Sequence, residues 1–167
     1  MSQSELARLH ANAAFSAKTG FSYGGTRLAL NRGMPQKRVL IVDDEWDNLE
    51  CLQELLQQEF AVVAACGGDA AVECLLSAQF DAVLLDLTMP DIDGFAVMQF
   101  IKRRFPRLPV MLTSGLPQLS EIASQTGASD WMSKPCHFEE LPHRLRRLMG
   151  VAEPRARAPE ARFQGAR

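Results

Sequence analysis

The fold is decided by the stretch VLIVDD at residues 39–44, in which four apolar residues run directly into two acidic ones. The stretch AVLLD at residues 82–86 repeats this pattern with a single acid at its end. Short runs that are apolar at every position indicate strands buried on both faces, as in a parallel sheet covered by helices. Ligands bind at the carboxyl ends of such strands. The two stretches therefore predict an α/β fold with a functional site at Asp43, Asp44 and Asp86.

Strand and helix patterns alternate from residue 38 to residue 150, and five such units predict a doubly wound (βα)5 sandwich of three layers. No internal repeat interrupts the alternation. The expected strands are Val39–Val42, Phe60–Cys66, Ala82–Leu85, Pro109–Ser114 and Trp131–Ser133. The helices are marked by apolar residues at helical spacing: Trp46, Leu49, Leu52 and Leu56; Val72, Leu75 and Leu76; Met98, Ile101 and Phe105; residues 120–126; and Phe138, Leu141, Leu145 and Leu148.

The ends of the chain differ in charge from its centre. Residues 1–38 carry a net charge of +5, residues 39–150 of −9 and residues 151–167 of +2. Nucleic-acid backbones require clustered Lys and Arg side chains, so the acidic centre argues against nucleic-acid binding by the folded body. We expect a mostly flexible extension at residues 1–36 with the pattern for one short helix, and one folded domain at residues 37–150. The remaining residues, rich in Pro, Ala and Arg, are expected to form a disordered tail.

The four cysteines show no metal-ligand spacing. We expect Cys51, Cys66 and Cys74 to be buried, reduced thiols among apolar neighbours, and Cys136 to be more exposed. No apolar stretch approaches the roughly 18 residues that a membrane span needs. The N-terminus also lacks the apolar segment of a signal peptide. These features predict a soluble, cytoplasmic protein with no membrane partner.

Three acids and one lysine are expected at the same edge of the sheet. Asp43, Asp44 and Asp86 would repel one another unless a cation lies between them, and a small set of oxygen ligands suits Mg²⁺. Asp86 follows a buried strand, so we expect its carboxylate to be exposed at the rim, where it can accept a phosphoryl group as an aspartyl phosphate. Lys134 follows the last strand and would supply a positive charge. A hydroxyl at the end of the fourth strand would donate to a phosphoryl oxygen.

Three motifs resemble those of the receiver domain of two-component response regulators. They are VLIVDDE at residues 39–45, LLDLTMPDIDG at residues 84–94 and GASDWMSKP at residues 127–135. The resemblance covers about residues 37–150 and implies a flavodoxin-like sheet of five parallel strands in the order 2-1-3-4-5. It also implies that Asp86 takes a phosphoryl group from a sensor histidine kinase or a histidine phosphotransfer protein.

The resemblance implies roles for individual residues of the site. Asp44 would bind Mg²⁺ directly, and Asp43 would bind it mainly through water. Asp86 would be both phosphoryl acceptor and metal ligand, and the backbone carbonyl of Thr88 would complete the ligands from the protein. Lys134 would contact the phosphoryl group, and its peptide bond to the following proline, Pro135, would be cis.

The hydroxyl that contacts the phosphoryl group lies at one of two positions. Receivers carry a small residue after this hydroxyl, which favours Ser114, followed by glycine, over Thr113. Trp131 lies where receivers have an aromatic side chain that swings inward, and we expect it in the core. The segment from Ser114 to Gly127 is about two residues shorter than in many receivers and contains Pro117. We therefore expect the fourth helix to be short or shifted.

The leading hypothesis is a phosphoacceptor that signals to a partner protein through a conformational change. It would catalyse its own phosphoryl transfer and dephosphorylation, and its downstream target is unassigned. Because few residues follow residue 150, we expect no DNA-binding domain. The alternatives are a phosphorylation-independent scaffold on the same fold and a phosphatase with an aspartyl nucleophile. Such phosphatases carry Asp-x-Asp on the first strand, whereas this strand ends in Asp43 and Asp44.

Overall fold

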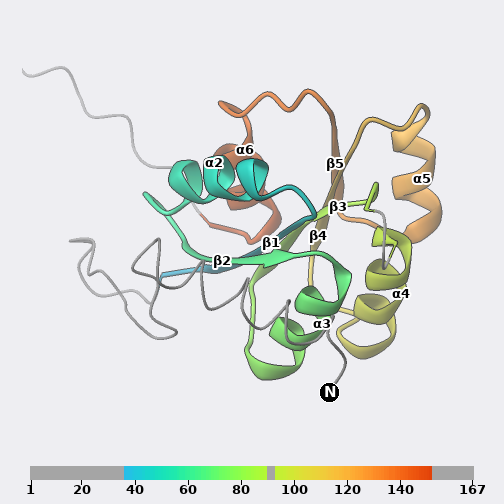
Figure 1. The fold of residues 1–167 in the computed structure, drawn as a ribbon, viewed down its shortest axis with the longest axis horizontal. Coiled ribbons are helices and arrows are strands. Elements are labelled where there is room, and N and C mark those ends of the chain that lie inside the picture. Colours follow the sequence, from blue (N-terminus) through green and yellow to red (C-terminus); the bar gives the residue numbers. More distant parts are fainter. Residues whose placement is uncertain (1–35, 90–92, 152–167) are drawn as a thin grey trace, which may run out of the picture. The chain divides into compact units, whose positions relative to one another are not determined.

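A parallel sheet of five strands lies at the centre of the computed structural model, which describes residues 36–89 and 93–151. The strands are β1 (Arg38–Asp43), β2 (Ala61–Cys66), β3 (Ala82–Asp86), β4 (Val110–Ser114) and β5 (Asp130–Ser133). They follow the order β2-β1-β3-β4-β5, and every neighbouring pair runs parallel. This arrangement confirms the predicted order 2-1-3-4-5 and the flavodoxin-like fold (Figure 1).

Helices cover both faces of the sheet. They are α2 (Trp46–Leu56), α3 (Gly68–Ser77), α4 (Gly94–Arg104), α5 (Leu119–Thr126) and α6 (Leu141–Leu148). Helices α2 and α6 pack on one face together with Ile41 and Leu84, and α3, α4 and α5 pack on the other together with Leu40 and Leu85 (Figure 1). Burying one such side chain stabilises the fold by about 1.5–3 kcal/mol. Within the described ranges, no helix is both long enough and apolar enough to cross a membrane.

Some sequence predictions lie outside the described residues. They concern the short helix in the N-terminal extension and the tail beyond residue 151. Asp93, the last acid of the LLDLTMPDIDG motif, lies inside the described part and accepts a hydrogen bond from the backbone N–H of Phe95 at 3.0 Å. Asp93 thus caps α4 and has a structural contact of its own.

Two strands begin one residue later than predicted. The N–H of Phe60 donates to the carbonyl of Leu56 at 2.9 Å, so Phe60 still belongs to the turn that closes α2. Pro109 has no N–H to donate to a neighbouring strand, and its carbonyl accepts from the N–H of Val83 at 3.0 Å just before β4 begins. Backbone hydrogen bonding, which apolar character does not report, therefore decides these boundaries.

Two apolar residues that we expected on buried helix faces are exposed. Leu76 is 64% exposed, because neighbouring residues of a helix point about 100° apart and Leu75 already faces the core. Phe138 is 41% exposed and precedes α6, which begins at Leu141. The prediction that Phe138 shares one helix face with Leu141 is wrong, since the intervening residues form a turn.

The cysteines also depart from the sequence prediction. Cys74 is buried, Cys66 and Cys136 are partly buried, and Cys51 is exposed. The expectation of a buried Cys51 is wrong because this residue lies on the solvent side of α2, whose buried side includes Leu49. Apolar neighbours in the sequence therefore did not indicate burial on this amphipathic helix.

An ion-pair network fastens α6 to the edge strand β5. Arg144 donates to both carboxylate oxygens of Asp130 and to the carbonyl of Trp131, the last at 2.6 Å. Arg147 lies 3.2 Å from the same carboxylate. Burial by itself would raise the pKa of Asp130, but the hydrogen bonds from Arg144 and from the N–H of Trp131, together with the two arginine charges, lower it overall. The carboxylate is thus stabilised in its charged form.

Gly94 begins α4 where there is no room for a side chain. A Cβ atom at this position would lie 2.3 Å from the backbone oxygen of Asp86 and 2.6 Å from the Cα of Leu87. Both are backbone atoms, so they cannot rotate out of the way. The glycine therefore lets α4 start directly against the end of β3, the strand that carries Asp86.

We expect Gly94→Ala to destabilise the fold by about 1–3 kcal/mol, because the added methyl group must push α4 away from β3. Gly115→Ala is the matched control, since a Cβ at residue 115 meets nothing within 4 Å. The free energy of unfolding in urea measures both effects. Equal stability of the two variants would show that α4 can start without this close approach.

We expect Asp130→Asn to lower the free energy of unfolding at pH 7 by roughly 1.5–3 kcal/mol, the range for hydrogen bonds to charged groups. Because the folded-state pKa of Asp130 is lowered, its contribution is present above the unfolded pKa of about 3.9 and is lost as pH falls through the folded value. The difference from wild type should therefore shrink in acid. Urea unfolding from pH 7 to pH 3 measures it, with the exposed Glu50→Gln as control. A difference that stays constant over this range would contradict the assignment.

Candidate functional site

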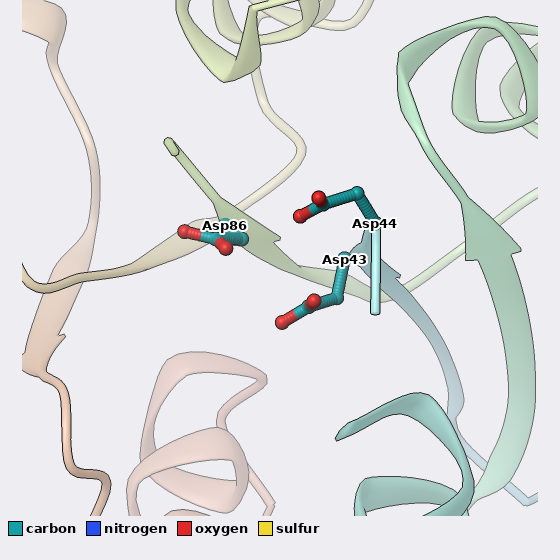
Figure 2. A group of neighbouring side chains, drawn as sticks. All are labelled: Asp43, Asp44 and Asp86. Atoms are coloured by element: carbon teal, nitrogen blue, oxygen red, sulfur yellow. The ribbon is translucent and has the colours of Figure 1, made fainter. Parts of the chain in front are cut away.

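Three carboxylates meet at one edge of the sheet. Asp43 ends β1, Asp44 follows it in the chain, and Asp86 ends the neighbouring strand β3. One carboxylate oxygen from each of the three residues lies within 4.8 Å of the other two. Figure 2 shows the three side chains gathered at the strand ends. The register of the parallel strands brings these acids together from positions 43 residues apart. The arrangement can hold a small divalent cation by oxygen atoms alone.

Lys134 follows the edge strand β5, and its side chain contacts two of these acids. Its Nζ lies 2.8 Å from Oδ2 of Asp86 and 3.0 Å from Oδ2 of Asp43. Burial by itself would lower the pKa of Lys134, but the hydrogen bonds to Asp86 and Asp43 and their negative charges raise it overall. The amine is therefore held as a cation beside the carboxylates, as a site for a phosphoryl group requires.

Asp86 is more buried than the sequence suggested. The expectation that its carboxylate is exposed at the rim is wrong, since the residue is only 2% exposed. The physical reason is that both of its oxygens have partners: the N–H of Thr88 donates to Oδ1 at 2.9 Å, and Lys134 covers Oδ2. A buried carboxylate held in this way is oriented before any ligand arrives.

Asp43 is held by its own loop and by a residue that sequence reasoning missed. The N–H of Glu45 donates to Oδ1 of Asp43 at 2.9 Å. The amide of Asn48 lies 3.4 Å from both Asp43 oxygens and 2.9 Å from Glu45. Asn48 lies three residues after Glu45, which directly precedes α2, and this spacing was the available signal.

The hydroxyl of Ser114 lies beside the turn that follows Asp86. Ser114 is fully buried at the end of β4, and its Oγ lies 2.8 Å from Oγ1 of Thr88. The same Oγ accepts from the N–H of Leu116 at 3.1 Å. The other candidate, Thr113, is 5% exposed and pairs with Asp86 in the sheet register, but no side-chain hydrogen bond joins it to these groups in the described part of the chain.

Trp131 lies within β5, and Pro135 follows the strand two residues after its end. Trp131 is 36% exposed, so the expectation of a core aromatic is wrong. On the edge strand β5, Met132 faces the core, and the alternation of side chains turns Trp131 outward. The peptide bond between Lys134 and Pro135 is cis, and the N–H of Lys134 donates to the carbonyl of Ser114 at 2.9 Å.

Two partly buried cysteines lie close to the acids. The thiol of Cys66 donates to the carbonyl of Asp44 at 3.4 Å. Burial raises the pKa of Cys66, and the charges of Asp44 and Asp43 raise it further. Burial likewise raises the pKa of Cys136. Within the described residues, the ligand atoms that converge within 4.8 Å come from the three carboxylates and from neither thiol.

The segment after Ser114 leads into a short helix, as expected. Helix α5 has eight residues, Leu119–Thr126. Gln118 precedes it with φ of 59° and ψ of 31°, and no side chain caps the helix. A non-glycine residue in this left-handed region costs about 1–2 kcal/mol. The connection between the Ser114 hydroxyl and α5 is therefore held under strain.

Comparisons with known proteins agree on one family. The model of the response regulator receiver domain matches residues 39–146. The transcriptional regulatory protein TctD of Salmonella typhimurium (strain LT2) is 34% identical over 115 residues, which cover 67% of this chain and 51% of TctD. The response regulator TrrA of Thermotoga maritima, solved in complex with Mg²⁺ and BeF, is 32% identical with a TM-score of 0.61 and covers 67% of this chain and 98% of its own.

The curated relatives are longer than the region that they share with this chain. A probable cyclic di-GMP phosphodiesterase of Vibrio cholerae is 33% identical over 116 residues, which cover 67% of this chain but 26% of that protein. Across the relatives, the chain spans about a quarter to a half of their length. Several are named as transcriptional regulators. Our expectation of no DNA-binding domain is therefore wrong, because it rested on the few residues after residue 150.

We expect Asp44→Asn to stabilise the metal-free protein and to weaken Mg²⁺ binding. Within the described residues, the Asp44 carboxylate makes no hydrogen bond or ion pair, so its charge mainly repels Asp43 and Asp86. Two charges 4 Å apart in water repel by about 1 kcal/mol, which sets the expected gain. Loss of a charged ligand should weaken Mg²⁺ binding about tenfold or more.

Thermal unfolding with and without Mg²⁺ measures both effects, because a bound cation stabilises the folded state by mass action. Asp47→Asn is the control: Asp47 is an exposed acid in the first turn of α2 and lies outside the cluster. The interpretation fails if Asp44→Asn destabilises the metal-free protein and leaves the Mg²⁺-dependent shift intact.

Proposed function

Because this chain belongs to the family of response regulator receiver domains in two-component signalling, we propose that Asp86 accepts a phosphoryl group in a Mg²⁺-dependent reaction. The donor would be a sensor histidine kinase or a histidine phosphotransfer protein. The phosphorylated receiver would then signal to a partner through a change in conformation. The family is one of signalling domains, so the reaction modifies the protein itself rather than a released substrate.

The observation that carries this proposal is the bridge from Lys134 to Asp86 and Asp43. It places a cation 2.8 Å from one oxygen of the acceptor carboxylate and 3.0 Å from a neighbouring acid. Phosphoryl transfer needs mainly positioning and neutralisation of charge, and this arrangement supplies both. A scaffold that never carried a phosphoryl group would have no reason to bury two acids against one lysine beside a third acid.

In the proposed reaction, a carboxylate oxygen of Asp86 attacks the phosphorus atom. The bond from phosphorus to the nitrogen of the donor's phosphohistidine breaks, and its electron pair leaves with the donor. Lys134 neutralises charge on the transferred group. Ser114, rather than Thr113, donates a hydrogen bond to a phosphoryl oxygen, which is supported by its place beside the turn after Asp86.

The acids fit a magnesium ion by their chemistry. The cluster offers carboxylate oxygens and no thiolate, and such oxygen ligands match the preference of Mg²⁺. We propose Asp44, Asp43 and Asp86 as ligands, with Asp43 acting mainly through water, and the backbone carbonyl of Thr88 as a further ligand. Bound there, Mg²⁺ would neutralise charge on the phosphoryl oxygens. The TrrA receiver, solved with Mg²⁺ and BeF, supports this assignment.

Other parts of the sequence interpretation remain proposals. We assign the receiver to residues 37–150, with an extension before it and a tail after it. A role for Trp131 in switching is supported only by its place three residues before Lys134, since its side chain is partly exposed. The cytoplasmic location also stays a prediction.

We expect acetyl phosphate and Mg²⁺ to phosphorylate the wild-type chain and Asp86→Asn to abolish the labelling, because the amide cannot form the acyl phosphate. Asp81→Asn is the matched control, because Asp81 lies just before β3 whereas Asp86 ends it. This variant makes the same substitution at the opposite end of the same strand and should still be labelled. Mass spectrometry of the intact protein measures the added phosphoryl group.

The alternatives give different results in the same assay. Absence of labelling in the wild-type chain would favour a phosphorylation-independent scaffold. Sustained hydrolysis of a phosphomonoester would favour a phosphatase. Labelling that persists in Asp86→Asn would show that another residue is the acceptor.

A further inference from the structure

The side chain of Ser114 is hydrogen-bonded to Thr88, and the proposed contact of Ser114 with a phosphoryl group does not explain this bond. Ser114 is fully buried and Thr88 is exposed, yet their hydroxyl oxygens lie 2.8 Å apart. The bond joins the turn after β3 to the end of β4 across 26 positions of the sequence. Through Thr88, the buried hydroxyl is thus connected to the surface of the molecule.

The inventory of donors and acceptors limits what this bond can be. A serine hydroxyl has one hydrogen to donate and can accept two hydrogen bonds. The N–H of Leu116 occupies one acceptor position of Ser114 at 3.1 Å. Either hydroxyl of the Thr88–Ser114 pair can be the donor at the observed distance. Without a phosphoryl group, the buried hydrogen of Ser114 needs an acceptor, and the described structure places the Thr88 oxygen within reach.

We propose that Thr88 is a positioning residue that exchanges donor and acceptor roles with Ser114 when a phosphoryl group is bound. In the resting protein, Ser114 donates to Thr88, and the hydroxyl of Thr88, a residue at the surface, donates to water. With a phosphoryl group on Asp86, Ser114 turns its hydrogen to a phosphoryl oxygen, and Thr88 turns its own hydrogen to Ser114. No covalent bond changes, and each hydroxyl rotates about its C–O bond. This inference rests on the proposed function of Asp86 and Ser114.

The exchange predicts an asymmetric effect of removing the Thr88 hydroxyl. In the resting protein, Ser114 would be left with a buried hydrogen and no acceptor, which is costly. With the phosphoryl group bound, that hydrogen has an acceptor, and Ser114 loses only one of two accepted bonds. In folded proteins, buried acceptors that lack one of two possible bonds are more common than buried donors with no partner, which indicates that they cost less. Loss of the Thr88 hydroxyl should therefore destabilise the resting state more and shift the protein towards the bound state.

The test uses Thr88→Val, which keeps the branched shape and removes the hydroxyl. Beryllofluoride in the presence of Mg²⁺ is the probe for the phosphoryl-bound state, and the fluorescence of Trp46 and Trp131 reports its binding. We expect the apparent dissociation constant of beryllofluoride to fall about five- to tenfold in Thr88→Val. Thr88→Ser retains a hydroxyl and should restore the wild-type value. In a Ser114→Ala background, Thr88→Val should change the constant less than about twofold.

The exchange is overturned if Thr88→Val binds beryllofluoride with an unchanged or weaker affinity. It is also overturned if Thr88→Val changes this affinity by the same factor in the Ser114→Ala background as in the wild type. Failure of the wild-type chain to bind beryllofluoride would instead overturn the proposed function. The hydrogen bond is then tested without any ligand, by urea unfolding of the wild type, Thr88→Val, Ser114→Ala and the variant that combines both substitutions. We expect Thr88→Val to lower the folding equilibrium constant about tenfold with Ser114 present and less with Ala at this position. Equal effects in both backgrounds would overturn the positioning role as well.

Discussion

The bridge from Lys134 to Asp43 and Asp86 is the interaction on which the rest of the site depends. It joins residues 91 and 48 positions apart and links the ends of three strands. Carboxylates that are almost fully buried are costly unless a partner compensates their charge. The lysine provides that partner, and the carboxylates in turn hold its charge. Because the register of a parallel sheet places strand ends side by side, the fold itself brings the three groups together.

The same bridge leaves the site short of positive charge. Three acids face one lysine, and Asp44 makes no hydrogen bond or ion pair within the described residues. A fold built for stability alone would fill such a space with apolar side chains. The surplus of negative charge favours a divalent cation, and a cation together with Lys134 favours a phosphoryl group. The repulsion among the three carboxylates destabilises the resting protein, and the same repulsion favours binding of the proposed ligands.

The sheet could be predicted from the sequence, but the burial of the residues at the site could not. Runs that are apolar at every position indicate buried strands, and acids at their ends indicate one edge, so Asp43, Asp44 and Asp86 could be grouped from the sequence. The burial of Asp86 could not be predicted, because it depends on where the Lys134 side chain points after β5. The four residues of β5 are too few to show which side of an edge strand faces the core, so Trp131 was misplaced. The bond between Thr88 and Ser114 depends on side-chain rotamers, which local sequence does not specify.

The proposed conformational signal has a physical route away from the site. Ser114 Oγ accepts from the N–H of Leu116, and the carbonyl of Ser114 accepts from the N–H of Lys134. A Ser114 hydroxyl that reorients towards a phosphoryl group is therefore bonded to the β4–α5 connection, and its residue is bonded to the end of β5. Two residues beyond Leu116, Gln118 lies in the left-handed region at the start of an uncapped helix. Because the start of α5 is strained and no side chain caps it, few stabilising interactions are lost when the loop rearranges. The weakly held β4–α5 connection, rather than the firmly bridged acids, is therefore where a small movement at Ser114 can become a change of the surface.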